Sequence, residues 1–157
     1  MAESSREETF TAFVHERGSH LKHALIATMG GAVGQDATSE ALAYGWEHWD
    51  RVGAMDNPCG YLYRVGRTRG LPSKRPTVLY SLPEPTSNST PWIEPGLPGA
   101  LADLSQMQRT VVMLVHAFGW SYRETAQLLE VTLGTVQRHM DRGMEKLRTA
   151  LKVDTDA

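Results

Sequence analysis

Five side chains near the end of the chain carry the groups best suited to recognition chemistry. They lie at the start and on one side of the last expected helix: Thr132, Thr135, Gln137, Arg138 and Arg142. In the major groove of DNA, an arginine can bond the edge of guanine at two points, and a glutamine can do the same with adenine. Threonine hydroxyls at a helix N-terminus can reach a phosphate. This set of residues predicts hydrogen bonding to DNA rather than a chemical reaction.

Catalytic and metal-binding patterns are missing from the sequence. It contains no glycine-rich phosphate loop, no Gly-x-Ser-x-Gly elbow and no metal-ligand spacing. The carboxylates are scattered and stand at expected helix starts, where capping explains them. We therefore predict that the protein is not an enzyme and has no catalytic residue, no metal site and no cofactor.

The histidines and the one cysteine also favour ordinary structural positions. His20 and His23 share a helix face, but no carboxylate or thiolate completes a metal site there, so surface positions are expected. Cys59 is the only cysteine, which excludes an internal disulfide. Only Arg64 stands nearby to lower the pKa of its thiol, so a buried or half-buried thiol is expected rather than a sensor of oxidants.

The charge balance limits how the protein could hold DNA. The 157 residues carry 16 Lys and Arg against 18 Asp and Glu, a net charge of −2. Non-specific binding depends on many cations that neutralise phosphates, so the balance argues against a free-standing, non-specific binder. Cations do gather locally, with five Lys or Arg against two Asp or Glu between Leu133 and Lys152. Any DNA contact is therefore expected to be local, or assisted by a larger assembly.

The sequence shows no secretory or membrane signal. The N-terminus is acidic and has no apolar core, and the longest apolar run, Val111 to Val115, cannot span a bilayer. We therefore expect a cytoplasmic protein that makes no membrane contact.

Two helices are expected to precede the recognition helix. Capping-box patterns mark their starts: Ser105 with Gln108, and Ser121 with Glu124. Gly119 closes the first helix, and the second runs for about two turns before the chain turns at Glu130 and Val131. This order of elements brings the chain to the last helix through a short corner.

The last helix begins at the capping residue Thr132 and is amphipathic. Its inner face carries apolar or small residues: Val136, Met140, Gly143, Leu147 and Leu151. Gly134, Arg138, Arg142 and Glu145 point to the other side, where Gly134 allows a close approach of the backbone. The arrangement predicts a helix-turn-helix. The alternative is an amphipathic helix pair of any all-helical core, whose cationic face is merely solvated.

Two helices are expected at the start of the chain. Apolar residues from Phe10 to Leu25 follow a helical spacing that stops at Gly30-Gly31. A second helix is expected from about Asp36, as its N-cap, through Trp46 and Trp49 on one face. Burial of at least one of these two tryptophans is expected.

A third helix and a long linker follow. Asn57 and Pro58 start this shorter helix, which ends at Gly70. From Leu71 to Gly99 the chain holds seven of its eight prolines, which oppose helix and central strand. A stretch of that length favours an extended tether between two modules. The sequence therefore predicts an all-α protein of two small helical domains, residues 1–70 and 100–157, joined by a Pro-rich linker at residues 71–99.

These motifs resemble those of a known family. Leu104-Ser-Gln-Met-Gln-Arg109, Trp120-Ser-Tyr-Arg-Glu-Thr-Ala126 and Val131-Thr-Leu-Gly-Thr-Val136 are similar to the fourth domain of the extracytoplasmic-function (ECF) group of bacterial RNA polymerase sigma factors. Asp36 to Trp49, followed by Asn57-Pro-Cys-Gly-Tyr-Leu-Tyr-Arg-Val65, is similar to the second domain of that group. The resemblance spans most of the chain outside the linker.

The resemblance implies a subunit that binds RNA polymerase core and directs it to promoters. In that family the second domain grips the clamp helices of the largest polymerase subunit, and it melts and reads the downstream (minus-ten) promoter element. The fourth domain docks on the flap of the second-largest subunit, and its last helix reads the upstream (minus-thirty-five) element. The implied partners are therefore RNA polymerase core and promoter DNA, and an anti-sigma factor is a further partner that the resemblance allows.

Carried onto this sequence, the resemblance assigns three sets of residues. Polymerase binding is assigned to Asp36, Glu40 and Trp46. The upstream element is assigned to Thr132, Leu133, Gly134, Thr135, Gln137, Arg138 and Arg142. The downstream element is assigned to the turn from Arg51 to Asn57 and to Tyr61, Arg64 and Arg67. There, aromatic stacking on an unpaired base is the expected mechanism.

The sequence departs from the family pattern at two places. The clamp-facing helix reads Asp36-Ala-Thr-Ser-Glu40, without the usual Gln and with smaller apolar residues. Gly70 and Pro72 cut off the third helix, which in the family continues for several Arg-rich turns. Two alternatives therefore stay open: a helix-turn-helix regulator without sigma activity, and a degenerate sigma-like subunit that needs a helper to melt promoter DNA.

Overall fold

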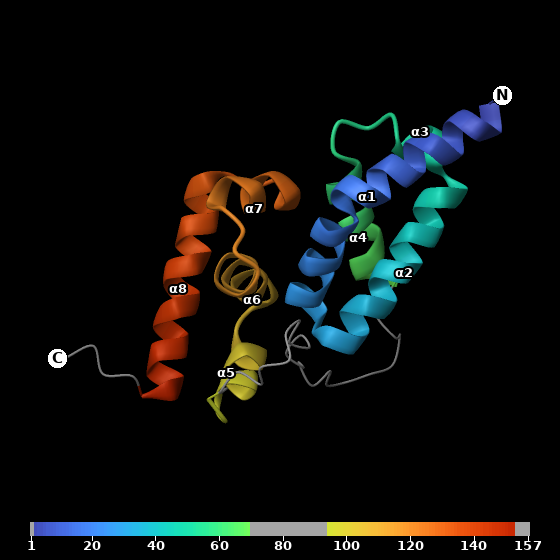
Figure 1. The fold of residues 1–157 in the computed structure, drawn as a ribbon. Helices are drawn as coiled ribbons and strands as arrows, with labels where there is room; N and C mark the ends of the chain where they lie inside the picture. Colours follow the sequence, from blue (N-terminus) through green and yellow to red (C-terminus); the bar gives the residue numbers. More distant parts are fainter. Residues whose placement is uncertain (1, 70–93, 153–157) are drawn as a thin grey trace.

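The computed structural model describes residues 2–69 and 94–152, and every regular element in these ranges is helical. The elements are α1 (Ala2–Met29), α2 (Gly31–Glu47), α3 (Trp49–Val52), α4 (Pro58–Arg69), α5 (Leu97–Asp103), α6 (Gln106–Val112), η1 (Met113–Ala117), α7 (Tyr122–Leu129) and α8 (Leu133–Leu151). They form two modules, α1 to α4 and α5 to α8, which lie side by side (Figure 1). The predicted all-α fold with two helical units is confirmed.

The turn between α1 and α2 lies at the predicted glycines, but α2 starts earlier than predicted. Gly30 has a φ of 92°, a conformation that favours glycine, and it ends α1. α2 begins at Gly31, so Asp36 is an exposed residue inside the helix and not its cap. The physical reason is close packing. A Cβ on Gly34 would lie 2.5 Å from the Cα of Ile26, so glycine lets the first turn of α2 cross the end of α1.

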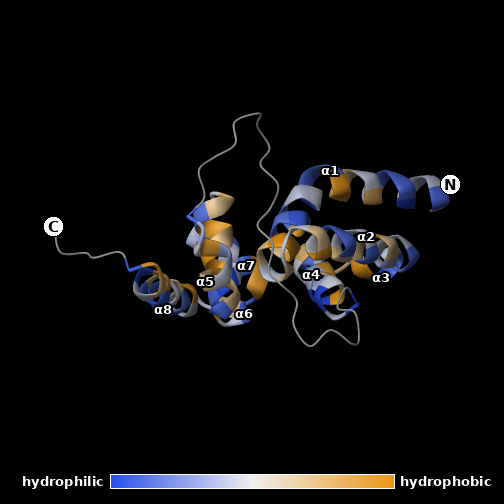
Figure 2. Cartoon of the chain, turned by 90° about the horizontal axis from the view of Figure 1, so that it is seen from below, coloured by the Kyte–Doolittle hydropathy of each residue, from blue (hydrophilic) through white to orange (hydrophobic). Residues whose placement is uncertain are grey.

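The N-terminal module closes around a core to which each of its helices contributes. The buried core residues include Leu21, Leu25, Ala41, Val52 and Leu62. Trp49 is buried with them, whereas Trp46 is 42% exposed, which agrees with the expected burial of at least one tryptophan. Hydrophobic stretches are most frequent in the middle of the molecule, where the two modules meet (Figure 2).

α4 begins as the sequence predicts. The backbone N–H of Gly60 donates to Oδ1 of Asn57 at 3.0 Å, so Asn57 caps the helix and Pro58 occupies its first position. The last described residue of the helix is Arg69, and the predicted stop at Gly70 lies outside the described residues. The short helix α3, between α2 and α4, has no counterpart in the sequence-based prediction.

α5 begins at Leu97 and so takes in the last residues of the predicted linker. Pro98 is compatible with this helix because it stands in the first turn, where a backbone N–H would have no intrahelical partner. The predicted domain boundary at residue 100 therefore falls inside α5. Residues 71–93 of the predicted linker lie outside the described residues.

The predicted caps of the next three helices are present. Each cap side chain accepts a hydrogen bond from the backbone N–H three residues later: Ser105 from Gln108, Ser121 from Glu124 and Thr132 from Thr135. Only the first of the two capping boxes is complete, because the Gln108 side chain also accepts from the backbone of Ser105. α6 continues through the π-helical turn η1, and Gly119, with a φ of 72°, follows it as predicted.

α8 packs on α6 through its predicted inner face. Val136, Met140, Gly143 and Leu147 are buried. A Cβ on Gly143 would lie 2.9 Å from Cγ2 of Val112, so glycine permits the close crossing of the two helices. The opposite face of α8 is left open to solvent.

The two modules contact each other directly. α1 lies against α6 and η1, and α4 lies against α7 (Figure 1). Three buried hydroxyls meet at this contact, with the oxygen of Thr28 2.7 Å from that of Tyr63 and 2.9 Å from that of Thr110. The guanidinium of Arg109 donates to the backbone carbonyl of Thr28 at 3.0 Å. The sequence indicated a tether between modules but not this packing.

Within residues 2–69 and 94–152, no helix is both long enough and apolar enough to cross a membrane.

Candidate nucleic-acid interface

α7 and α8 form the helix-turn-helix that the sequence predicts. α7 ends at Leu129, and Glu130 turns the chain in a left-handed conformation with a φ of 56°. The hydroxyl of Thr132 then caps α8 and lies 2.8 Å from the hydroxyl of Thr135. Both hydroxyls are thus hydrogen-bonded within the corner, where they fix the first turn of α8.

The outer face of α8 presents the remaining upstream-element candidates to solvent. These exposed residues are Leu133, Gly134, Gln137, Arg138 and Arg142. Leu133 is 44% exposed, so its side chain can contact a partner without any movement of the helix. A Cβ on Gly134 would meet only the Thr132 hydroxyl, 3.9 Å away, so no packing inside the protein requires glycine there. In the described part of the chain, neither arginine forms an ion pair, so both guanidinium groups can meet an external anion.

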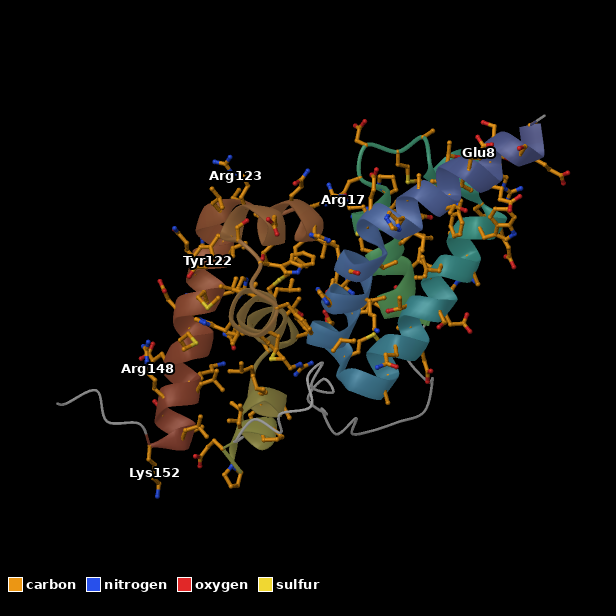
Figure 3. All side chains as sticks on the ribbon, in the orientation of Figure 1. Glu8, Arg17, Tyr122, Arg123, Arg148 and Lys152 are labelled. Atoms are coloured by element: carbon orange, nitrogen blue, oxygen red, sulfur yellow. The ribbon has the colours of Figure 1, made fainter. Side chains whose placement is uncertain are left out.

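Other residues modify the charge of this face. Burial, followed by repulsion from Arg138 and Arg142, lowers the pKa of His139, so its imidazole is neutral near pH 7. Figure 3 shows Arg148 on the side of α8 away from the N-terminal module, and Lys152 at the C-terminal end of the helix. These two cations extend the positive surface beyond the residues that the sequence motif singled out.

The downstream-element candidates share α4 but have different partners. Arg64 forms an ion pair with Glu130 of the other module, with 2.6 Å between Nη1 and Oε2. Arg67 lies over the ring of Tyr63, its Cζ 5.7 Å from the ring centroid. Tyr61 is half-buried and belongs to a cluster of aromatic and cationic side chains. In this arrangement of the modules, Arg64 is therefore paired with the corner of the helix-turn-helix.

The cluster around Tyr61 was not predicted. The hydroxyls of Tyr44 and Tyr61 lie 3.2 Å apart, and the guanidinium of Arg51 donates to them at 2.6 and 3.3 Å, respectively. The hydrogen bonds with Tyr44 and Arg51 lower the pKa of Tyr61. Arg69 lies over the ring of Tyr44, its Cζ 4.7 Å from the ring centroid. No sequence signal could have found this cluster, because its members come from α2, α3 and α4.

The predicted polymerase-binding residues are all exposed on α2. Asp36 and Glu40 are one helical turn apart and share a face. Trp46 lies on a different side, where its ring centroid is 5.3 Å from that of Phe10 and 4.9 Å from the Cζ of Arg6. The structure therefore brings Asp36 and Glu40 together but not Trp46.

His20 and His23 are half-buried between the modules, so they are less exposed than the expected surface positions. The ring of His23 stacks on Phe118 with 4.3 Å between centroids, and the ring of His20 lies 4.7 Å from that of Trp120. Burial, followed by repulsion from His20 and Lys22, lowers the pKa of His23. Among the described residues, no group of three or more His, Cys, Asp or Glu could hold a metal ion.

A cleft of about 240 Å³ lies between the modules beside His20. Arg17, on the side of α1 that faces α7, and Glu124 line its walls together with Cys59 (Figure 3). The Cys59 thiol is buried, as expected, and this burial raises its pKa to about 11. The thiol is therefore uncharged near pH 7, and it is not an activated nucleophile.

Comparison with known proteins finds a family model similar to the C-terminal module and a relative similar to most of the chain. Residues 97–147 match the family model of sigma-70 region 4. The ECF RNA polymerase sigma factor SigL of Mycobacterium tuberculosis, from strain H37Rv among others, is 27% identical over 146 residues. That alignment covers 83% of this chain and 81% of SigL.

A solved structure has a similar fold. The sigma factor RpoE of Bartonella quintana, in a co-crystal structure with the anti-sigma factor NepR, matches with a TM-score of 0.61 and 20% identity. The match covers 92% of this chain and 98% of the matched chain, so it includes both helical modules.

Proposed function

The sequence comparisons confirm the resemblance to ECF sigma factors, and from this premise we propose that the protein binds RNA polymerase core and directs it to promoters. The observation that carries this proposal is the helix-turn-helix of α7 and α8 within the region 4 match. The second helix of this motif, α8, is capped by the hydroxyl of Thr132. It exposes Arg138 and Arg142, and neither of them forms an ion pair with a carboxylate among the described residues.

In this proposal α8 reads the upstream promoter element from the major groove. Arg138 and Arg142 suit guanine edges and Gln137 suits an adenine edge. The open space around Gly134 lets the start of the helix approach DNA closely. A helix with three or four phosphate contacts binds weakly alone at physiological salt, so the upstream element is read when polymerase presents the module to DNA.

The N-terminal module contacts the polymerase and the downstream element in this proposal. Asp36, Glu40 and Trp46 on α2 meet the clamp helices of the largest subunit, and the C-terminal module docks on the flap of the second-largest subunit. Tyr61, Arg64 and Arg67 on α4 meet the downstream element. The exposed ion pair of Arg64 with Glu130 must open for this contact, which costs at most about 1 kcal/mol because both side chains are well solvated.

An anti-sigma factor is proposed as a further partner. The matched RpoE chain was crystallised with such a protein, NepR, and that chain aligns with both modules of this one. A partner of this class would compete with the polymerase for the protein.

The proposal is tested by mixing the purified full chain with RNA polymerase core and separating the mixture by size-exclusion chromatography. We expect co-elution, and we expect Glu40→Lys to weaken it because the substitution reverses a charge on the clamp-facing side of α2. Glu16→Lys is the matched control, since Glu16 is an exposed acid of α1 outside the proposed contact. Failure of the unchanged protein to co-elute would contradict sigma activity and leave the helix-turn-helix regulator as the better hypothesis.

A further inference from the structure

We propose that the cleft between the two modules binds a free α-amino acid with an apolar side chain. This cleft, which we call the module cleft, has a volume of about 240 Å³. Its walls come from α1, from the turn before α4 and the start of α4, and from Trp120 and α7. The inference goes beyond the proposed function, and it can be tested without polymerase or DNA.

The buried part of the lining, which we call the floor of the module cleft, is apolar. It consists of Phe13, Cys59, Trp120 and Leu128, each of them at most 9% exposed. The thiol of Cys59 is uncharged near pH 7, so it adds to the apolar surface. Small-molecule sites commonly lie between domains and combine such a lining with a few polar groups. The floor therefore suits an apolar side chain of a ligand.

The exposed part of the lining, which we call the rim, carries charges of both signs. It includes Arg17, Asp56 and Glu124. Burial raises the pKa of the Cys59 thiol and the charge of Arg17 opposes this rise, so the guanidinium lies close to the cleft. Neither Arg17 nor Asp56 forms an ion pair among the described residues, and Oε2 of Glu124 lies 4.0 Å from Nε2 of His20. Charged groups of both signs are thus available to a ligand.

The two signs select the chemical class of the ligand. A guanidinium can donate two parallel hydrogen bonds to a carboxylate, which assigns the carboxylate of the ligand to Arg17. The carboxylates of Asp56 and Glu124 accept hydrogen bonds and would bind an ammonium group. A ligand with a carboxylate alone would also face these two acidic groups, at a cost in affinity. An α-amino acid carries both charged groups next to each other and satisfies both halves of the rim.

The volume of the module cleft limits the ligand to a small molecule. About 240 Å³ is the share of about eight water molecules in the liquid. Sites for drug-sized ligands are larger, at about 300–1,000 Å³. The cleft therefore has room for one amino acid and is too small for a nucleotide.

Contacts between the modules hold the walls of the cleft in place. Nδ2 of Asn57 donates to the backbone carbonyl of Gln127 at 3.1 Å. A Cβ on Gly60 would lie 3.0 Å from the carbonyl oxygen of Leu128, so α4 and α7 approach closely there. Binding to a formed cleft orders few additional groups, which favours affinity. The ligand would touch both modules and so stabilise their packing.

The test follows the four tryptophan indole N–H signals of the isotope-labelled full chain by NMR. The spectrum of Trp120→Phe identifies the signal of Trp120. We expect L-phenylalanine to shift this signal with a Kd of about 1 mM or tighter, and to leave the signals of the other tryptophans in place. L-Serine has the same charged groups but no apolar side chain, so it should bind at least about tenfold more weakly.

Analogues of phenylalanine and a matched pair of variants test the rim. Phenylpropionate lacks the ammonium group and phenylethylamine lacks the carboxylate, so each should bind about fivefold or more weakly than L-phenylalanine. Arg17→Gln should weaken L-phenylalanine by about the same factor and leave phenylethylamine unchanged. Arg123→Gln is the control and should change neither, because Arg123 is an exposed arginine of α7 that does not line the cleft (Figure 3).

Three results would overturn the inference. The first is a Trp120 signal that does not move at about 10 mM L-phenylalanine. The second is binding of phenylpropionate as tight as that of L-phenylalanine, which would make the cleft a site for simple carboxylates. The third is an equal effect of Arg17→Gln and Arg123→Gln on the binding of L-phenylalanine.

Discussion

At the scale of single residues, Gly134 is a glycine that the packing of the protein does not require, although close binding of DNA could require it. A Cβ at this position would meet no side chain or backbone atom closer than 3.9 Å, so the fold has no need of glycine there. The residue stands in the first turn of α8, where a helix would approach DNA. We propose that glycine at this position keeps space for DNA.

Replacing Gly134 with Ala should strengthen the fold and weaken DNA binding. Alanine stabilises a helix by about 0.5–1 kcal/mol relative to glycine, and the open space accepts the added methyl group. In the polymerase complex the same methyl group would meet the DNA backbone. Urea denaturation and DNA binding by the complex measure the two effects. Unchanged DNA affinity in the stabilised variant would show that α8 does not approach DNA at this point.

His23 predicts a loss of stability in acid. Burial lowers its pKa in the folded protein below the ordinary value of 6.5, so the unfolded chain binds more protons as the pH falls through that value. Stability should therefore fall as the pH drops below about 6.5. Urea midpoints between about pH 8 and pH 5 should fall less for His23→Gln than for the unchanged protein. His15→Gln is the control, because His15 is exposed on the same helix; equal slopes for both variants would contradict this prediction.

Residue-level prediction worked where the signal is local in sequence. The caps at Ser105, Ser121 and Thr132 follow from side chains that bond a backbone group three residues away. The stack of His23 on Phe118 joins residues that are far apart in sequence, and no spacing rule predicts it. The same is true of the cluster of Tyr44, Arg51, Tyr61 and Arg69, whose geometry depends on how three helices pack.

At the scale of elements, glycines decide how closely helices cross. The N-cap of α2 was predicted six residues too late, at Asp36 instead of Gly30, because Asp36 is a good capping residue, whereas the packing of Gly34 on Ile26 begins the helix earlier. The amphipathic pattern of α8 did predict its buried face, since that pattern records which side meets the core. Helix faces were thus easier to predict than helix starts.

The crossing of α6 and α8 predicts a cost for Gly143→Ala. The new Cβ would lie 2.9 Å from Cγ2 of Val112, which is buried and cannot move aside freely. We expect a net loss of about 1–2 kcal/mol in the free energy of unfolding, after the gain in helix propensity is included. Urea denaturation measures this loss. The double variant Gly143→Ala/Val112→Ala should lose less stability than the sum of the losses of the two single variants. Strict additivity of the two losses would contradict the contact.

At the scale of the whole molecule, the two modules are joined by polar side-chain contacts as well as by the linker. The hydroxyl cluster of Thr28, Tyr63 and Thr110 is buried between them. The ion pair of Arg64 with Glu130 is exposed and joins α4 to the corner before α8. The contact between the modules therefore combines buried hydrogen bonds between hydroxyls with an exposed ion pair that contributes little stability.

Replacing Thr28 with Val should destabilise the protein by about 1–3 kcal/mol, because the hydroxyls of Tyr63 and Thr110 each lose a buried partner. The shape of the side chain is kept, so the effect reports the hydrogen bonds. Thr38→Val is the matched control, since the buried Thr38 hydroxyl bonds only to the carbonyl of Gly34 within α2 among the described contacts. Thermal unfolding compares the two variants. Equal losses would mean that the hydrogen bonds of Thr28 with Tyr63 and Thr110 contribute nothing.

The central claim is that this protein directs RNA polymerase to promoters, and run-off transcription tests it most directly. DNA selected from a random library by the complex of core and protein serves as the template. We predict a transcript with a defined start only when both core and protein are present. Arg138→Ala should abolish this transcript, and a base change at one position of the upstream element should have the same effect on the unchanged protein. Co-elution with core but no defined transcript from any selected DNA would contradict the claim.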